Sequence, residues 1–369
     1  MNNLKEINPF KTTVKKSDFG ILTTLEVDFD LSAKSGICLG EKTLLATDIY
    51  EMGDEYTTLV YTLIDKNGQM QSFVEEEGIL PNFFKSPDEH IFVYVQPYDP
   101  DKDLDICIPV FNRENYEYPK RKRPFVGTFA GILGNYSILH DNWSNTWDDN
   151  KPDKMRAVEF KDGKVKKDHN SKIPLPKDNK IYVGSDEIHL LAYTPKGAIH
   201  RQIDIKANVI QERKLTLKVP FFREILHLSF TEDSQLISTK KGKIFLERVS
   251  KNGESEVSEL IDIKDDIYAT FKPEKIAENT FAIRFVKEFG NGWFVIREGK
   301  LLEFFYGNKG KKGYKNLLTD ELIPMDDEDL IITELHKTAE NNYTVIFYLR
   351  TEQGAKNKKL IILNRKVKG

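Results

Sequence analysis

Residues 62–73 read TLIDKNGQMQSF, and residues 247–258 read ERVSKNGESEVS. Each stretch contains an apolar, strand-like run, a Lys-Asn-Gly corner and a second, more polar run. Glycine suits such a corner because a tight hairpin needs a residue that tolerates positive φ. The same hairpin in two distant parts of one chain indicates an internal repeat, which specifies the architecture of the whole chain.

The repeat continues along the chain. We expect corners after a third strand at Gly68, Glu114, Gly163, Gly197, Gly253, Gly313 and Gly369. Their mean spacing is about 50 residues, close to the period of four-stranded propeller blades. Units begin with two apolar runs across a short polar turn, as in ICLGEKTLLATD and AGILGNYSILHD. Short β-branched and aromatic runs of this kind, without a sustained helical stripe, predict an all-β fold.

This pattern resembles β-propeller proteins in general over residues 20–369, without the signature of any one subfamily. The resemblance implies a single β-propeller domain, with residues 1–19 as an N-terminal extension. Seven corners predict seven four-stranded blades. The 34 residues between Gly163 and Gly197 are few for one blade, so six blades stay an alternative.

The two ends of the repeat predict how the ring closes. The last run, NKKLIILN (357–364), has the character of a third strand and no fourth strand follows it. The run ILTTLEVDFDL (21–31) has no partner strands before it. We therefore expect the N-terminal run to be the outer strand of the last blade, which removes an exposed sheet edge.

Composition excludes several classes of function. The formal net charge is −3, so neither nucleic acid nor a membrane surface is expected as a partner. No run approaches the ~18 apolar residues of a membrane helix, and the N-terminus lacks the apolar core of a signal peptide. A cytoplasmic protein is expected, with an exported protein that has lost its signal peptide as the alternative. Cys38 and Cys107 are expected to be small buried residues.

Uneven loops indicate where a site would lie. In a propeller, the loops between strands two and three emerge on one face. In the first three units these loops are long, at 50–56, 97–105 and 140–153, and they belong to neighbouring blades. They are acidic and aromatic, which suits a cation, a cationic peptide or a carbohydrate. The candidate binding residues are Tyr50, Asp54, Tyr56, Tyr98, Asp99, Asp101, Asp103, Asp141, Trp143, Trp147, Asp148 and Asp149.

More specific sequence motifs do not match the sites that they suggest. DPDKDLD (99–105) has the alternating aspartates of a calcium loop, but Leu104 stands where the loop needs glycine and Val110 where it needs glutamate. His189 and His200 lie on one expected hairpin without metal-ligand spacing, so surface or core histidines are expected. The basic run PKRKRPF (119–125) is interpreted as a solvated edge. No metal and no cofactor are expected.

Two functions remain. The first is a non-catalytic binding or scaffold protein that presents the acidic and aromatic loop face to a protein or glycan. The alternative is a carbohydrate-directed hydrolase or lyase that uses carboxylates on the same face, for which Asp54, Asp141 and Asp148 are the candidates. Such an enzyme needs two carboxyl groups about 5–9.5 Å apart. A binding face needs no such convergence, so binding ranks first and a catalytic role is assigned to no residue.

Overall fold

The structure is a computed structural model. It describes residues 5–7, 10–27, 30–50, 58–75, 79–87, 91–96, 110–111, 116–117, 128–141, 154–161, 164–170, 179–184, 187–194, 197–216, 218, 226–229, 233–240, 242–264, 267–271, 273–287, 290–308, 310–325, 330–349 and 359–368.

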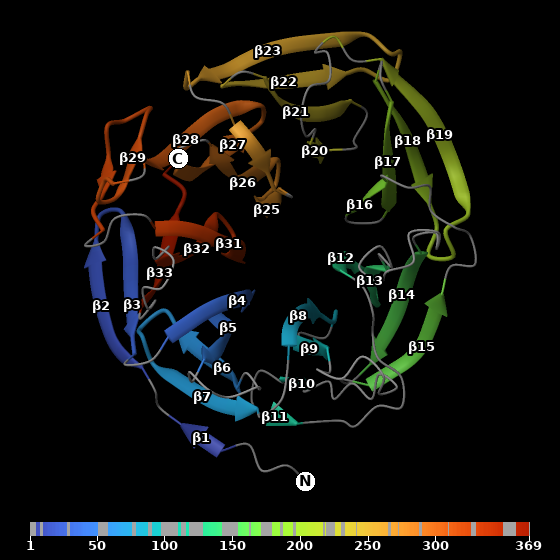
Figure 1. Ribbon diagram of the computed structural model, residues 1–369. Coiled ribbons are helices and arrows are strands. Elements are labelled where there is room, and N and C mark those ends of the chain that lie inside the picture. The colour runs from blue at the N-terminus through green and yellow to red at the C-terminus, as the bar shows by residue number, and fades with distance from the viewer. Residues whose placement is uncertain are drawn as a thin grey trace.

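Over these residues the chain forms seven antiparallel sheets arranged as a ring (Figure 1). Each sheet is one blade, so the predicted all-β propeller is confirmed. It has seven blades, the larger of the two predicted numbers. Blade 1 contains β4 (Asp30–Leu39), β5 (Lys42–Tyr50), β6 (Thr58–Asp65) and β7 (Met70–Glu75), with β1 (Lys5–Ile7) outside β7. Blade 2 contains β8 (Ile79–Lys85), β9 (Ile91–Gln96), β10 (Val110–Phe111) and β11 (Tyr116–Glu117). Blade 3 contains β12 (Thr128–Leu133), β13 (Tyr136–Asp141), β14 (Lys154–Lys161) and β15 (Lys164–Asn170).

The remaining blades complete the ring. Blade 4 contains β16 (Asn179–Val183), β17 (Ile188–Thr194), β18 (Gly197–Ile203) and β19 (Val209–Thr216). Blade 5 contains β20 (Leu226–Ser229), β21 (Ser234–Lys240), β22 (Lys243–Val249) and β23 (Ser255–Asp262). Blade 6 contains β24 (Ile267–Thr270), β25 (Glu274–Ala277), β26 (Thr280–Lys287), β27 (Gly290–Arg297), β28 (Lys300–Asn308), β29 (Tyr314–Asn316) and β30 (Leu322–Ile323). Blade 7 contains β31 (Leu330–Ala339), β32 (Asn342–Leu349), β33 (Lys359–Lys366), β3 (Gly20–Glu26) and β2 (Lys11–Ser17).

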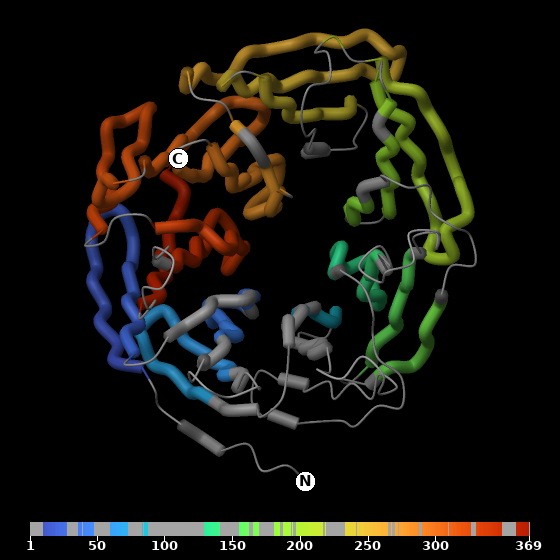
Figure 2. The backbone as a smooth tube through the Cα atoms, viewed as in Figure 1, coloured from blue at the N-terminus to red at the C-terminus, as the bar shows by residue number. Residues whose placement is uncertain are grey.

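Blade 7 closes the ring, as predicted, because the early strands β2 and β3 join the late strands β31, β32 and β33 in one sheet (Figure 2). β3 pairs with β33 in a register that places Ile21 opposite Asn364 and Glu26 opposite Lys359. The closing strand is shorter than the predicted 21–31, because Leu31 already belongs to β4 of blade 1. β2 pairs outside β3 as a fifth strand. Residues 1–19 thus contribute β1 and β2 as outer strands, and the division into an extension and one domain stays a prediction.

The two Lys-Asn-Gly corners have the same geometry. Gly68 N–H donates to the Asp65 carbonyl at 3.0 Å, and Gly253 N–H donates to the Ser250 carbonyl at 2.9 Å. Both glycines have positive φ, at 81° and 84°. The sequence repeat therefore reflects one turn, used between the third and fourth strands of blades 1 and 5.

A third copy of this turn carries no glycine, and this corrects the predicted register of blade 4. Asp204–Asn208 joins β18 to β19, and Ala207 N–H donates to the Asp204 carbonyl at 2.9 Å with φ at 66°. Alanine therefore stands where the other two corners have glycine. Gly197, the predicted corner, instead is the first residue of β18, the third strand of the blade.

Blade 6 needs a similar correction. Its third and fourth strands, β27 and β28, are joined at Glu298 and Gly299, both with positive φ. Gly313 lies further on, between β28 and the added β29. With Ala207 and Gly299 in place of Gly197 and Gly313, the first six corners are 44 to 49 residues apart and the short spacing disappears, while the last interval, from Gly299 to Gly369, is 70 residues.

The hydrophobic core lies between neighbouring blades. Between blades 6 and 7, Trp293 is fully buried and stacks on Phe305 at 4.8 Å between ring centroids, while Phe347 meets it edge-on. Similar clusters of described residues join blades 3 and 4, 4 and 5, 5 and 6, and 7 and 1, for example Leu25 of blade 7 with Leu45 and Val60 of blade 1. Apolar residues on both faces of the inner strands are needed because each blade packs against two neighbours. Cys38 is one of these buried residues, as predicted.

Candidate functional site

The predicted loop residues fall largely outside the described residues. Ten of the twelve lie there: Asp54, Tyr56, Tyr98, Asp99, Asp101, Asp103, Trp143, Trp147, Asp148 and Asp149. The other two, Tyr50 and Asp141, are the last residues of β5 and β13. Cys107 and the basic run 119–125 also lie outside the described residues. The loop site therefore stays a prediction.

The strands that flank these loops are described. β5 and β6, β9 and β10, and β13 and β14 are each the second and third strands of a blade. The three blades are neighbours, since β4 contacts β8 and β8 contacts β12. Second strands run in the same direction in every blade, so the described ends of β5, β9 and β13 lie at one face of the ring.

A different group of ionisable residues lies on the innermost strands. β31 carries Glu334 and His336 at alternate positions, which places both side chains on one side of the strand. Their side chains are 27% and 18% exposed, and His336 Nε2 lies 3.6 Å from Glu334 Oε2. Both residues lie on β31, the innermost strand of blade 7.

Two charged residues of blade 6 also contact β31. Arg284 of β26 crosses to β31, where its guanidinium donates to the carbonyls of Ile332 and Thr333 and lies 3.8 Å from the centre of the Phe271 ring. Glu274 of β25 accepts a hydrogen bond from the Lys337 backbone N–H at 2.9 Å. We call Lys85, Glu274, Arg284, Glu334 and His336 the axial cluster.

Lys85 belongs to blade 2, which borders blade 1 on the side opposite to blade 7. It is the last residue of β8 in blade 2, yet its ammonium group is close enough to lower the pKa of His336 in blade 7. It is half-buried. Among the described residues, no carboxylate lies within 4.0 Å of its Nζ atom. Blades 6, 7 and 2 thus place charged groups around the inner edge of blade 1.

Burial sets the protonation of the cluster near neutral pH. Burial raises the pKa of Glu334 to about 7, Arg284 opposes this rise and Glu274 adds to it. Burial lowers the pKa of His336 to about 4, while Glu274 and a hydrogen bond to the Gly36 backbone oppose the fall. At neutral pH His336 is uncharged and Glu334 holds its proton about half of the time.

The hydrogen bonds of His336 define its tautomer. A bond to the Gly36 backbone that favours the charged ring must run from a ring N–H to a carbonyl. Nε2 is buried and has no hydrogen-bond partner, so the donor to Gly36 is Nδ1. Nε2 of the neutral ring is then an acceptor without a donor.

Sequence reasoning missed the axial cluster. The run ITELHK (332–337) reads as an ordinary strand with alternate polar residues. Its only signal is that a glutamate and a histidine alternate on an innermost strand, where apolar residues are expected. The described residues contain no group of three or more His, Cys, Asp or Glu side chains that could hold a metal ion.

His189 and His200 are core residues, one of the two expected outcomes. They are 3% and 6% exposed. Arg213 Nε–H donates to His200 Nδ1 at 2.9 Å, and His189 Nδ1 lies 3.0 Å from His200 Nε2. Because a guanidinium only donates, His200 Nε2 carries the proton and His189 Nδ1 accepts it. Both rings are neutral, since burial lowers their pKa values to about 4 and about 3. This chain joins strands of blade 4.

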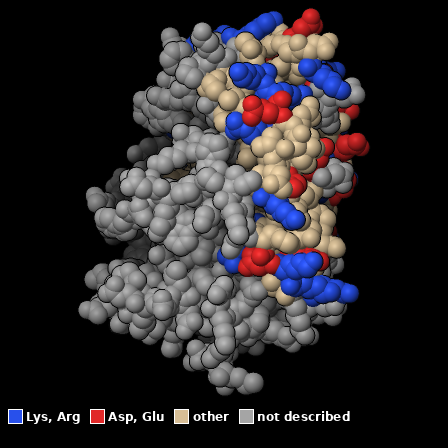
Figure 3. All heavy atoms as spheres, turned by 90° about the vertical axis from the view of Figure 1, so that its right-hand side faces the viewer, with Lys and Arg blue, Asp and Glu red and all other residues tan. Residues whose placement is uncertain are grey.

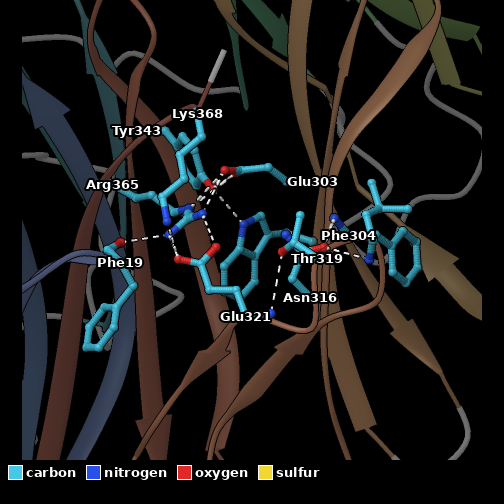
Figure 4. Close-up of polar contacts among 11 residues, drawn as sticks. Phe19, Glu303, Phe304, Asn316, Thr319, Glu321, Tyr343, Arg365 and Lys368 are labelled. Atoms are coloured by element: carbon cyan, nitrogen blue, oxygen red, sulfur yellow. Dashed lines mark hydrogen bonds and ion pairs between the residues drawn. The ribbon is translucent and has the colours of Figure 1, made fainter.

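A network of buried charged residues among the described residues has a structural role. Arg365 of β33 lies between the carboxylates of Glu303 and Glu321 (Figure 4), with Nη2 at 2.7 Å and 2.9 Å. It also donates to the Phe19 carbonyl at 2.8 Å, beside the closing strand β3. Tyr343 Oη donates to Glu303 at 2.7 Å. We call Phe19, Glu303, Glu321, Tyr343 and Arg365 the closure network, because it ties the closing hairpin to blades 6 and 7.

Comparisons with known proteins identify the fold. No protein-family model matches the sequence, and no curated protein matches it. Polysaccharide lyase Uly1 superposes with a TM-score of 0.51 at 9% identity, over 91% of this chain and 90% of the lyase. The chain is a β-propeller. The β-propeller domain of the Trilobed protease from Pyrococcus furiosus, described as having an open velcro topology, matches with a TM-score of 0.51 at 10% identity, over 92% of this chain and 98% of that domain.

A third similar structure belongs to a longer protein. Pyrococcus horikoshii acylaminoacyl peptidase matches with a TM-score of 0.50 at 11% identity, over 92% of this propeller and 52% of the peptidase. The propeller thus spans about half the length of that peptidase. At these identities the similarity shows the fold alone, because one propeller scaffold carries many unrelated activities.

Proposed function

We propose that this propeller is a non-catalytic binding or scaffold protein, whose partner is a protein or a glycan held on the face formed by loops 50–56, 97–105 and 140–153. One observation carries the proposal. The flanking strands of all three loops are second and third strands of neighbouring blades, so the described strand ends beside the loops lie at the same face. A rigid scaffold that gathers long loops at one face is a common basis for recognition.

The composition of these loops supports a polar, carbohydrate-like or cationic partner. They contain Trp143 and Trp147 together with many aspartates. Aromatic rings bind sugar faces and cations, while carboxylates accept hydrogen bonds from hydroxyl and ammonium groups. Large aromatic residues are the usual anchors of an interface.

The described outer surface gives no comparable signal for nucleic acid. On the side shown in Figure 3, basic and acidic side chains alternate over the coloured residues. Several charged side chains of the described residues are paired, for example Arg201 with Glu212 at 2.7 Å. A phosphate backbone is bound by surfaces of one sign, and the described part of this side has both. The described residues also contain no helix that is long and apolar enough to cross a membrane.

The test compares one aromatic and one acidic residue of the loops. Glycan-array and pull-down screening with the whole chain first identifies a ligand, and its affinity is then measured for Trp147→Ala and Asp141→Asn. A binding face predicts a loss of about 2 kcal/mol or more for Trp147→Ala. Asp141→Asn should lose only about 0–1 kcal/mol, because exposed charge contacts are weak.

Glu256→Gln is the matched control, since Glu256 is an exposed carboxylate on the outer strand of blade 5. Its affinity should equal that of the wild type. Turnover of a glycan that disappears in Asp141→Asn while affinity is unchanged would instead support the hydrolase or lyase. Equal affinity of all three variants would contradict the proposed face.

A further inference from the structure

The chain contains three Asn-Gly pairs, at residues 67–68, 252–253 and 291–292. Asparagine before glycine is prone to lose its side-chain amide, because the backbone nitrogen of the next residue can attack the carboxamide carbon. Glycine has no side chain to block this approach. In a folded protein the reaction also needs an accessible carboxamide and a turn that can open locally. The structure separates the three pairs on both points.

The pair in blade 6 is protected inside the core. Asn291 is 6% exposed, and both polar atoms of its carboxamide have partners. Its Nδ2 donates to the Leu330 carbonyl at 2.8 Å, and its Oδ1 accepts from Tyr314 Oη at 2.8 Å and from the Ile332 N–H at 3.1 Å. Attack on this group requires the blade to open, so we expect no reaction at this pair in the folded chain.

The corner of blade 1 is exposed but firmly held. Asp65 Oδ1 accepts hydrogen bonds from the N–H groups of Asn67 at 2.8 Å and Gln69 at 2.9 Å. A carboxylate acceptor makes both bonds stronger than bonds to a neutral group. β2 also covers this turn, since a Cβ atom added to Gly68 would overlap the Val14 side chain. We therefore expect this corner to open rarely.

The matching corner of blade 5 has weaker restraints. Asn252, Gly253 and Glu254 are all exposed. Ser250 stands in the place of Asp65, and its neutral hydroxyl accepts from the Glu254 N–H at 3.1 Å, a longer bond than either bond of Asp65. No described atom lies within 4 Å of a Cβ atom added to Gly253. This corner therefore has no strand packed over it as the corner of blade 1 does, and it opens more easily.

We propose that Asn252 is a site of spontaneous deamidation, while the fold protects Asn67 and Asn291. The Gly253 nitrogen loses its proton to the solvent and bonds to the side-chain carbonyl carbon of Asn252. The carbon–nitrogen bond of the carboxamide breaks, and its nitrogen leaves as ammonia after taking a proton from the solvent. Water then opens the cyclic succinimide at either carbonyl, which gives aspartate or isoaspartate.

The reaction changes the corner and leaves the proposed loop face untouched. Isoaspartate adds one atom to the backbone, which moves the Gly253 N–H away from the Ser250 carbonyl that it now contacts at 2.9 Å. The turns between third and fourth strands lie at the opposite face of the ring from the loops between second and third strands. Deamidation of Asn252 should therefore leave the affinity of a ligand on the loop face unchanged, and either proposal can fail without the other.

The test measures all three sites in one sample. The whole chain is incubated at pH 8, and peptide mass spectrometry with electron-based fragmentation follows the conversion of each asparagine to aspartate and isoaspartate. In the folded protein Asn252 should react at least about threefold faster than Asn67, and Asn291 should stay intact. In guanidinium chloride the three sites should react at similar rates, because each precedes glycine and the folded structure no longer separates them.

Exchanging the two acceptors tests the cause of the difference. Ser250→Asp should slow the reaction of Asn252 about threefold or more, since a carboxylate then holds the turn. Asp65→Ser should accelerate the reaction of Asn67. Ser258→Asp is the matched control, because it adds the same charge at an exposed position of β23 away from the corner, and the rate at Asn252 should not change. Circular dichroism confirms that each variant is folded.

Three results would overturn the proposal. One is equal rates at Asn67 and Asn252 in the folded wild-type protein, a comparison that needs no variant. Another is an intact Asn252 in the folded chain over a period in which the unfolded chain has reacted. The third is an equal effect of Ser250→Asp and Ser258→Asp, because the acceptor of the turn would then not control its opening.

Discussion

At the scale of single residues, the turn at Gly68, Gly253 and Ala207 shows both the strength and the limit of the sequence pattern. Glycine marked two of the three turns, because left-handed backbone is costly for other residues. Ala207 adopts the same backbone with φ at 66° and is buried between blades 3 and 4. Packing of its methyl group offsets the strain. A pattern that relies on glycine cannot find such a position, which is why the register of blade 4 was wrong.

The two glycine corners should respond differently to a methyl group. Gly253→Ala should lower the free energy of unfolding by about 1–2 kcal/mol from backbone strain alone, because nothing lies within 4 Å of the new Cβ atom. Gly68→Ala should cost more, since its Cβ atom would overlap Val14 of β2. Urea unfolding of both variants measures the difference. In a chain without residues 1–17 the two costs should converge, and a difference that persists would show that Val14 is not its cause.

At the scale of elements, the strands were predictable and the axial cluster was not. Apolar runs and turn residues are local properties, so most strands and the closing partner of β33 could be read from them. The axial cluster depends on which side chains meet across blades. Glu274 and Glu334 are 60 residues apart in the sequence, and their strands β25 and β31 meet only because blades 6 and 7 are neighbours. The predicted loop residues could be named from composition, but their convergence is also a property of the ring.

Deleting the N-terminal strands should separate their contributions. Loss of residues 1–17 removes β2 and buried Phe10 but leaves β3, so the chain should stay soluble with a lower unfolding temperature. Loss of residues 1–27 also removes β3, which exposes the edge of β33 and should leave the chain aggregated. Soluble yield and thermal unfolding distinguish the two. A soluble, cooperatively unfolding chain without residues 1–27 would show that β3 is dispensable for closure.

At the scale of the whole molecule, the closure network links segments that are distant in the chain. Arg365 contacts the Phe19 carbonyl near one end of the sequence and Glu303 and Glu321 of blade 6. Arg365 and Glu303 are almost completely buried. Removing one member of a buried ion pair is costly because the other keeps its charge without compensation. The ring therefore has one point where several elements are held by charge as well as by apolar packing.

Two cations that share Glu321 provide a matched test of this network. Arg365→Met should lower the free energy of unfolding by about 3–5 kcal/mol, because Glu303 stays buried without its partner. Lys368→Met should cost at most about 1 kcal/mol, since Lys368 is 56% exposed. Denaturant unfolding measures both. Adding Glu303→Gln to Arg365→Met should recover part of the loss. Equal costs for the two single substitutions would show that burial does not strengthen the network.

Ring closure also sets the order of events during synthesis. β3 is translated more than 300 residues before its partner β33. Until then the hairpin of β2 and β3 has an open backbone edge in a crowded cell, where any other extended chain can pair with it. Pairing across so long a stretch of chain is also slow. We therefore expect the nascent protein to depend on chaperones until residues 359–366 emerge, and the completed ring to need none.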